Sequence, residues 1–154
     1  MSVNLEVSIE IRATPMQVWN AVSDLTRMPQ WSPQTKKVIV RGGPLKLGSA
    51  MINFNRRDVR VWATRSRVVA FDPGRRIAWE MKENHAIWSF DLEPLDDNTR
   101  TRLIERRDVS AGVSKMSKLL ITKFLGGEEN FDKELTTGMR QTLQRIRSSV
   151  ETGA

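Results

Sequence analysis

The C-terminal stretch from Glu128 to Glu151 places the strongest constraint on what this chain can fold into. Its apolar residues are spaced by fours with one step of three, at Phe131, Leu135, Met139, Leu143, Ile146 and Val150. This spacing predicts a helix with one apolar stripe and otherwise polar faces. Such a helix spans roughly 34 Å, and its stripe needs a partner to cover it. Because most of the preceding chain has the pattern of strands, we predict a curved sheet that wraps around this helix.

The first part of the chain predicts one strand followed by two short helices. Residues 3–11 alternate between apolar and polar without a miss, which is typical of a half-buried antiparallel strand. Thr14 then provides an N-cap and Pro15 suits the first helical position. A second short helix is expected within residues 23–33, where two prolines end it.

Six further strands are predicted between residues 37 and 107, with turns between them. Asp72-Pro73-Gly74 and Asp96-Asp97-Asn98 are strong turn signals. Short connections between neighbouring strands predict an antiparallel meander. The expected strands cover residues 37–41, 49–57, 60–71, 76–82, 86–95 and 99–107.

Length and composition limit the possibilities further. The chain has 154 residues, a length that fits a single domain over residues 1–154. It has no cysteine, which excludes disulfides and thiolate metal sites. No apolar run approaches the ~18 residues of a membrane span, and the N-terminus lacks the pattern of a signal peptide. We therefore expect a cytoplasmic protein with no cofactor and no metal.

Particular residues resemble the START-like (SRPBCC) superfamily, and within it the polyketide cyclase/dehydrase-type families of small bacterial proteins. The matching segments are Thr14-Pro15-x-x-Val18-Trp19-x-x-Val22-Ser-Asp24-Leu25, Met28-Pro-Gln-Trp31-Ser-Pro33, Gly48 with Phe54 and Asn55, Trp62, Val68 with Pro73-Gly74, Trp88-x-Phe90-x-Leu92-Glu93-Pro94 leading to Thr99, and Gly138-Met-x-x-Thr142-Leu143-x-Arg145-Ile146. The resemblance implies an α+β helix-grip fold, in which a seven-stranded antiparallel sheet grips the long helix around a cavity. Members bind lipids, sterols, polyketides and plant hormones, and a minority catalyse cyclisation or dehydration. A fold of this kind implies a cavity more securely than an activity.

The strand parities and helix stripes nominate the residues that would line such a cavity. The candidates for contact with a ligand are Met51, Asn53, Asn55, Trp62, Trp79, Trp88, Phe90, Met116, Leu120, Phe124, Leu135 and Met139. Amides on a cavity wall orient the oxygen atoms of a ligand. The opposite parity, in which Ile52 and Phe54 point inward, stays open. The tryptophans also suit a plain core.

No catalytic constellation stands out. Glu105 is the best candidate for an inward carboxylate, because it shares parity with Thr101 and Leu103. It either acts as an acid or base or pairs with Arg107 on the same face. The one histidine, His85, has the setting of a solvated loop residue. The absence of tyrosine removes a group that polarises carbonyls, so whether the protein is an enzyme stays open.

The net charge of +7 raises the question of a polyanionic partner. Alternation places many arginines on the convex face of the sheet, where cations discourage edge association. A single-stranded nucleic-acid platform would interleave aromatic residues with those arginines, but Trp79, Trp88 and Phe90 take the opposite parity. Nucleic-acid and anionic-membrane binding are therefore disfavoured.

These observations predict a monomer or homodimer that binds a small, largely apolar molecule, such as a lipid, a polyketide or another aromatic or isoprenoid metabolite. The alternatives are a cyclase or dehydratase using the same cavity, and a toxin-like or regulatory interaction protein with a basic surface.

Overall fold

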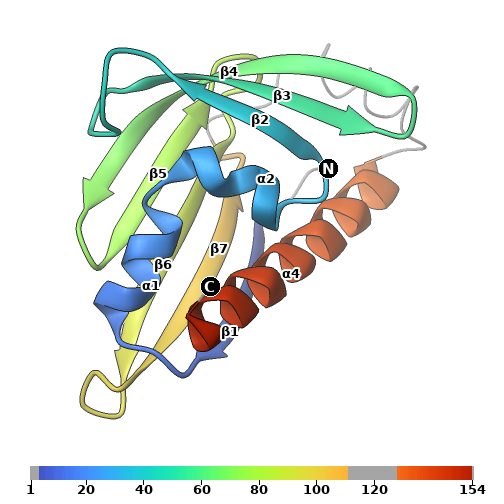
Figure 1. Ribbon diagram of the computed structural model, residues 1–154. Coiled ribbons are helices and arrows are strands. Elements are labelled where there is room, and N and C mark those ends of the chain that lie inside the picture. Colours follow the sequence, from blue (N-terminus) through green and yellow to red (C-terminus); the bar gives the residue numbers. More distant parts are fainter. Residues whose placement is uncertain (1–3, 111–127, 154) are drawn as a thin grey trace.

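The structure is a computed structural model, and it describes residues 4–110 and 128–153 (Figure 1). Its strands are β1 (Leu5–Ile11), β2 (Thr35–Val40), β3 (Ala50–Arg57), β4 (Arg60–Asp72), β5 (Arg76–Met81), β6 (Ile87–Leu95) and β7 (Arg100–Asp108). Its helices are α1 (Pro15–Val22), the short 3-10 helix η1 (Leu25–Arg27), α2 (Met28–Trp31) and α4 (Glu128–Thr152). Val113, Met116, Leu120 and Phe124 recur at helical spacing, which predicts a further short amphipathic helix ahead of α4, but this segment lies outside the described residues. Elsewhere the predicted element order is confirmed, with small shifts at the strand ends.

The seven strands form one antiparallel sheet in the order β1-β7-β6-β5-β4-β3-β2. Consecutive strands from β2 to β7 are neighbours, as their short connections predict, and β1 closes the far side by pairing with β7. The sheet curves, and α4 lies across its concave side, with α1 and α2 beside it (Figure 1). The prediction of a helix-grip fold is therefore confirmed.

Local sequence explains where α1 begins. The hydroxyl of Thr14 accepts a hydrogen bond from the Gln17 amide at 3.2 Å, and the Gln17 side chain accepts one from the Thr14 amide at 2.8 Å. This reciprocal capping box satisfies two amides that the helix leaves without partners, and Pro15 needs no donor at the first position. The Thr101 hydroxyl donates to the Ala13 carbonyl at 2.8 Å, which ties this corner to β7.

The turn between β6 and β7 uses the residues that tolerate a left-handed backbone. Asp96, Asp97 and Asn98 have φ values of 49°, 54° and 67°. Asn and Asp adopt this region more readily than other non-glycine residues, because their short side chains hydrogen-bond the local backbone. The predicted turn is thus confirmed.

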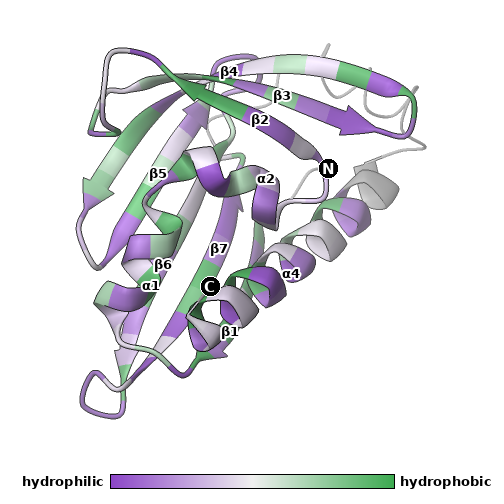
Figure 2. Ribbon diagram, in the orientation of Figure 1, coloured by the Kyte–Doolittle hydropathy of each residue, from purple (hydrophilic) through white to green (hydrophobic). Residues whose placement is uncertain are grey.

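The core lies between the concave face of the sheet and one end of α4. Ile11 on β1, Phe90 on β6 and Leu103 on β7 are fully buried, and so is Ile146 on α4, with Leu143 almost so. The helix packs against β1, β7, α1 and α2. Figure 2 shows hydrophobic and hydrophilic residues alternating along the strands, as a sheet with one covered face requires. None of the helices in the described part of the chain is long and apolar enough to cross a membrane.

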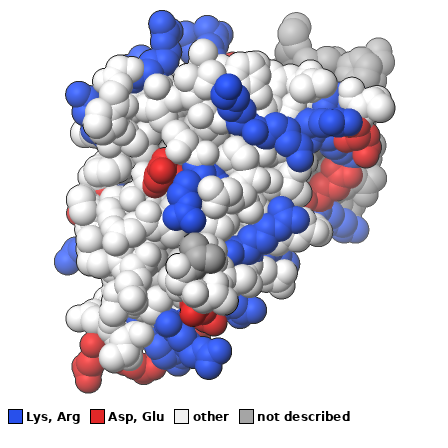
Figure 3. Space-filling model, viewed as in Figure 1, with Lys and Arg blue, Asp and Glu red and all other residues white. Residues whose placement is uncertain are grey.

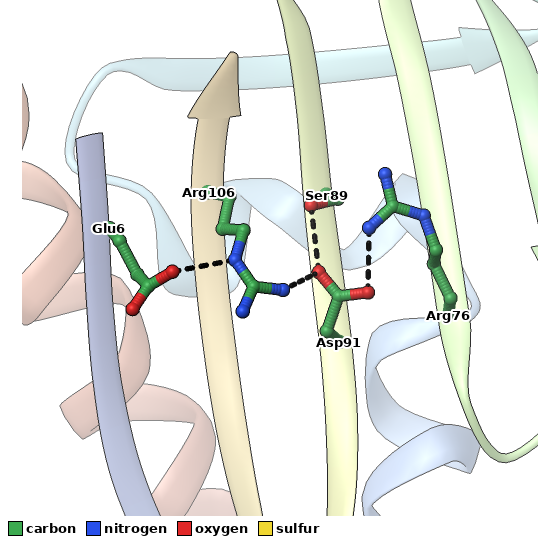
Figure 4. Close-up of polar contacts among 5 residues, drawn as sticks. All are labelled: Glu6, Arg76, Ser89, Asp91 and Arg106. Carbon is green, nitrogen blue, oxygen red and sulfur yellow. Dashed lines mark hydrogen bonds and ion pairs between the residues drawn. The ribbon is translucent and has the colours of Figure 1, made fainter. Parts of the chain in front are cut away.

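The convex face of β1, β7, β6 and β5 is covered by interlocked charges (Figure 4). Arg106 donates to Glu6 at 2.6 Å and to Asp91 at 2.7 Å, and Arg76 donates to the other oxygen of Asp91 at 2.7 Å. The Ser89 hydroxyl also donates to Asp91, at 3.0 Å. We call Glu6, Arg106, Asp91, Arg76 and Ser89 the charge ladder. Many of the arginines that alternation placed on this face are therefore neutralised by partners within the sheet.

The convex face of the remaining strands is different. Phe54 on β3 is 37% exposed, and Val61 at the start of β4 is 73% exposed. Cross-strand partners of these residues are Ala63 for Phe54 and Arg56 for Val61. This half of the sheet therefore presents apolar side chains and cations to solvent without an equivalent of the charge ladder among the described residues.

Candidate functional site

A cavity of about 450 Å³ lies between the concave face of the sheet and the first half of α4. Its wall is formed by β2 to β7, by the segment from η1 to the start of β2, and by α4. Volumes of several hundred Å³ are typical of small-molecule sites. The side chains of the described residues leave this space open, at the position where the resemblance implied a cavity.

Eight of the twelve residues expected to contact a ligand line this cavity. They are Met51, Asn53, Asn55, Trp62, Trp79, Trp88, Leu135 and Met139, and the candidate acid Glu105 lines it too. Phe90 is not among the lining residues: it is fully buried behind the wall, with its ring centroid 5.7 Å from that of Trp79. Met116, Leu120 and Phe124 lie outside the described residues.

The parity of β3 is now decided. Asn53 and Asn55 face the cavity, while Phe54 is on the convex side. Their side-chain amides donate across to β4, from Asn53 to the Ser66 hydroxyl at 3.1 Å and from Asn55 to the Thr64 hydroxyl at 3.2 Å. Because these bonds use the NH₂ groups, the two amide oxygens keep their capacity to accept.

The opposite wall holds a buried carboxyl group. Glu105 on β7 is 3% exposed, and its Oε1 atom has no hydrogen-bond partner among the described residues. Burial raises the pKa of Glu105 to about 8, because the charged form loses its hydration. At neutral pH this side chain is therefore mostly a neutral acid, which can donate a hydrogen bond or a proton into the cavity.

Arg107 lies two residues further along the same face of β7, and it also lines the cavity. Its guanidinium carbon lies 5.9 Å from the centre of the Trp88 ring, a cation–π geometry. Burial lowers the pKa of Arg107, while the charge of Asp132 on α4 acts in the opposite direction. One end of the cavity thus combines a carboxyl donor, a guanidinium and an aromatic face.

Several lining residues were not nominated from the sequence. They include Leu25, Met28, Val38, Thr64, Met81, Arg107, Gly138 and Thr142. Strand alternation could have predicted two of them, because Arg107 shares a face with Glu105 and Thr64 shares a face with Trp62. Helical spacing could have predicted Thr142, which follows Met139 by three residues. The segment around η1 and α2 also lines the cavity, but no periodic pattern of apolar residues in the sequence predicted this.

The one histidine, His85, is not among the residues that line the cavity. His85 lies in the turn between β5 and β6, with a φ of 60°. No group of three or more acidic, histidine or cysteine residues suited to a metal ion occurs within residues 4–110 and 128–153. The described residues offer the site hydrogen bonding, a carboxyl proton on Glu105, the guanidinium group of Arg107 and apolar contact.

Comparisons with known proteins agree with this architecture. The model of a protein family described as polyketide cyclase / dehydrase and lipid transport matches residues 2–151. A Polyketide_cyc-like protein, Cgl2372 from Corynebacterium glutamicum, is 28% identical with a TM-score of 0.68, and the match covers 99% of this chain and 94% of that one.

Two further solved structures share the fold at lower identity. The Zhui aromatase/cyclase from Streptomyces sp. R1128 is 18% identical with a TM-score of 0.78, over 97% of this chain and 93% of that one. The Aha1 dimer from Colwellia psychrerythraea is 16% identical with a TM-score of 0.65, over 98% of each chain. No curated protein matches the sequence. Since the family match spans nearly the whole sequence, this chain belongs to the polyketide cyclase/dehydrase and lipid transport family.

Proposed function

We propose that this protein binds a small, largely apolar molecule in the cavity between the sheet and α4. The observation that supports this most directly is the cavity itself, about 450 Å³ in volume and lined by aromatic, aliphatic and a few polar side chains. A folded chain gains dispersion energy by filling such a space with its own atoms. A space of this size that the described residues leave open therefore favours a molecule from outside.

The polar groups on the wall favour a ligand that carries oxygen atoms. Glu105 offers a proton donor from β7, and the amide oxygens of Asn53 and Asn55 offer acceptors from β3. Few, well-placed polar groups in an apolar site orient a ligand rather than supply most of its affinity. A hydroxyl group on an aromatic, isoprenoid or polyketide skeleton could donate to the amide oxygens and accept from Glu105, whereas a carbonyl group could accept from Glu105 only.

The first experiment identifies the molecule. Protein purified from its native host is denatured, and the released small molecules are analysed by mass spectrometry. We expect a stoichiometric apolar compound from the wild type. Leu135→Trp enlarges a side chain on the cavity wall and is expected to release none. Gln144→Trp places the same side chain on an exposed position of the same helix and is expected to release as much as wild type.

Two results would contradict binding in this cavity. One is equal loading of wild type and Leu135→Trp; the other is a wild type that is empty and also fails to bind apolar probes in solution. Trp62, Trp79 and Trp88 line the cavity, so their fluorescence reports whether an added probe enters it.

A second candidate function is a cyclase or dehydratase reaction in the same cavity, and Glu105 is the observation that favours it. A carboxyl group whose pKa lies near 8 is protonated at neutral pH and able to act as a general acid toward a substrate oxygen. Glu105→Gln keeps the size and the hydrogen-bonding ability but cannot transfer a proton. If Glu105→Gln binds the identified ligand as tightly as wild type but no longer converts it, Glu105 is catalytic. If the wild type binds this ligand and does not convert it, the protein is a binding protein only.

A further inference from the structure

A second hollow, about 550 Å³ in volume, opens on the surface beside the cavity. It lies between the start of β2, the end of β3 and the first half of α4. Pro33, Gln34, Glu134 and Gly138 line both the hollow and the cavity. The two spaces are therefore adjacent, and we call the outer one the mouth groove.

Cations from three separate elements meet in the mouth groove. They are Lys36 from β2, Arg56 and Arg57 from β3 and Lys133 from α4, and they face two carboxylates, Asp58 and Glu134. Figure 3 shows Lys and Arg side chains gathered where β2, the end of β3 and the first turns of α4 meet, with acidic side chains beside them. Among the described residues that line the mouth groove, cations therefore outnumber carboxylates.

The positions of two of these cations follow from the local backbone. The pairing of β2 with β3 shifts register between Thr35 and Lys37, so Lys36 occupies a bulge, a feature that redirects a side chain. Its ammonium group lies 3.4 Å from the carbonyl oxygen of Pro33, and both residues line the groove. Arg56 has the parity of Phe54, so it leaves β3 on the convex side. Its Nε donates to the Asp58 carbonyl at 2.9 Å, which holds it at the end of the hairpin, where it lines the groove.

The cations of the mouth groove differ from those of the convex face. On the charge ladder each arginine has a carboxylate partner. In the mouth groove Arg57 forms an ion pair with Glu134 across to α4, but Lys36 and Arg56 form no ion pair with any described residue. Lys36 and Arg56, which line the groove beside an apolar cavity, therefore have no ion-pair partner within the described part of the chain and can pair with the anionic end of a ligand.

We propose that the mouth groove is an anion site for the head group of an amphiphile whose apolar part occupies the cavity. This rests on the proposed function, and it narrows the ligand to a compound with a carboxylate or phosphate at one end. Guanidinium groups bind both anions through charge-assisted hydrogen bonds, and a lysine adds a mobile point charge. Arg57 forms an ion pair with Glu134, which lines both spaces, so Arg57 is held where the groove adjoins the cavity.

The test compares three amphiphiles that share one alkyl chain: decanol, decanoate and decyl phosphate. Each displaces the uncharged fluorescent probe N-phenyl-1-naphthylamine, and tryptophan fluorescence checks that the cavity is filled. At neutral pH and low salt we expect the two anions to compete about tenfold better than decanol, as one favourable charge-assisted contact would give. Added salt should reduce this preference, because exposed charges are screened.

Charge reversal then locates the site. The double variant Lys36→Glu and Arg56→Glu should lose the preference for anions while its affinity for decanol stays unchanged. Arg67→Glu makes the same type of change at an exposed position of β4 outside the groove, and it should keep the preference. Preservation of decanol binding shows that the double variant is folded.

The outcomes separate this inference from the proposed function. If decanol competes as well as both anions, the head-group site is refuted and the cavity site stands. If Arg67→Glu removes the preference as completely as the double variant, the effect is general surface charge and the inference is also refuted. If none of the three compounds displaces the probe, both the head-group site and the apolar binding site in the cavity are refuted. A preference for only one anion supports the site and assigns it to a phosphate or to a carboxylate.

Discussion

The two halves of this molecule use the same sheet and the same helix in different ways. In one half, which we call the packed half, β1, α1 and the parts of β6 and β7 away from the cavity close on the C-terminal part of α4, where Leu143 and Ile146 are buried. In the other, the hollow half, the N-terminal part of α4 stands across a cavity from β3 and β4, and Leu135 is one wall of it.

The outer surfaces repeat this contrast. Behind the packed half the charge ladder crosses four strands, whereas behind the hollow half Phe54 and Val61 are exposed to solvent. A single helix thus contributes stability at one end and a candidate binding site at the other. We expect substitutions in the packed half to affect folding and those in the hollow half to affect binding.

The largest expected effect separates the two ends of α4. Ile146→Ala removes a fully buried side chain and leaves a hole in close-packed surroundings, which should lower the free energy of unfolding by about 4 kcal/mol. Leu135→Ala enlarges a cavity that already exists, and it should cost only about 1 kcal/mol. Urea denaturation of both variants measures the difference, and equal losses would remove the distinction between the halves.

Glu105 should make stability depend on pH. Its pKa is raised from 4.5 to about 8 on folding, so the folded state keeps a proton that the unfolded state releases over this interval. The contribution is fully present below pH 4.5 and is lost as pH rises through about 8. Its slope is at most about 1.4 kcal/mol per pH unit.

Glu105→Gln should remove this slope, because a glutamine side chain does not titrate. Urea denaturation at several pH values between these two limits tests it, with wild type and variant compared at each. A slope that persists in Glu105→Gln would assign the pH dependence to other groups.

The charge ladder should have one sensitive position. The side chain of Asp91 is 16% exposed and accepts from Arg76, Arg106 and Ser89, so Asp91→Ala should cost about 2 kcal/mol. Glu93 on the same face is 50% exposed, and its pair with Arg102 is open to water. Glu93→Ala should therefore stay within about 0.5 kcal/mol of wild type. Thermal denaturation of both variants decides whether the ladder stabilises the packed half.

A small stabilising effect is expected at Gly138, at the boundary between α4 and the cavity. A Cβ atom there would meet the Pro33 side chain at 3.6 Å, an ordinary contact. Gly138→Ala should therefore raise the free energy of unfolding by about 0.5–1 kcal/mol, since alanine favours the helix interior. A loss of stability in urea denaturation would show that the helix needs a closer approach to Pro33 than an alanine permits.

The sequence by itself determined the elements and the fold class. Local patterns predicted these elements: the alternation in residues 3–11, the Thr14 cap and the apolar stripe from Leu135 to Ile146. Such patterns fix which residues share a face of a strand or helix, whatever the rest of the chain does. Together with the turn residues they predicted the sheet, its meander and the helix it grips. Most side chains nominated for the cavity wall followed from the same parities.

Only the tertiary structure decided which features came together around a cavity. Asn53 and Phe54 alternate on β3, and the sequence cannot tell which of two mixed faces is covered. The pairing of β3 with β4 puts Asn53 opposite Thr64, and both residues line the cavity. Phe90 has the parity of Trp88, yet it lies where the packed half leaves no space.

The chemistry of Glu105 depends on its loss of contact with water, which distant elements impose. The mouth groove likewise exists because β2, β3 and α4, far apart in the chain, bring their cations to one place. Burial and proximity across the chain are properties of the fold, and no local pattern encodes them.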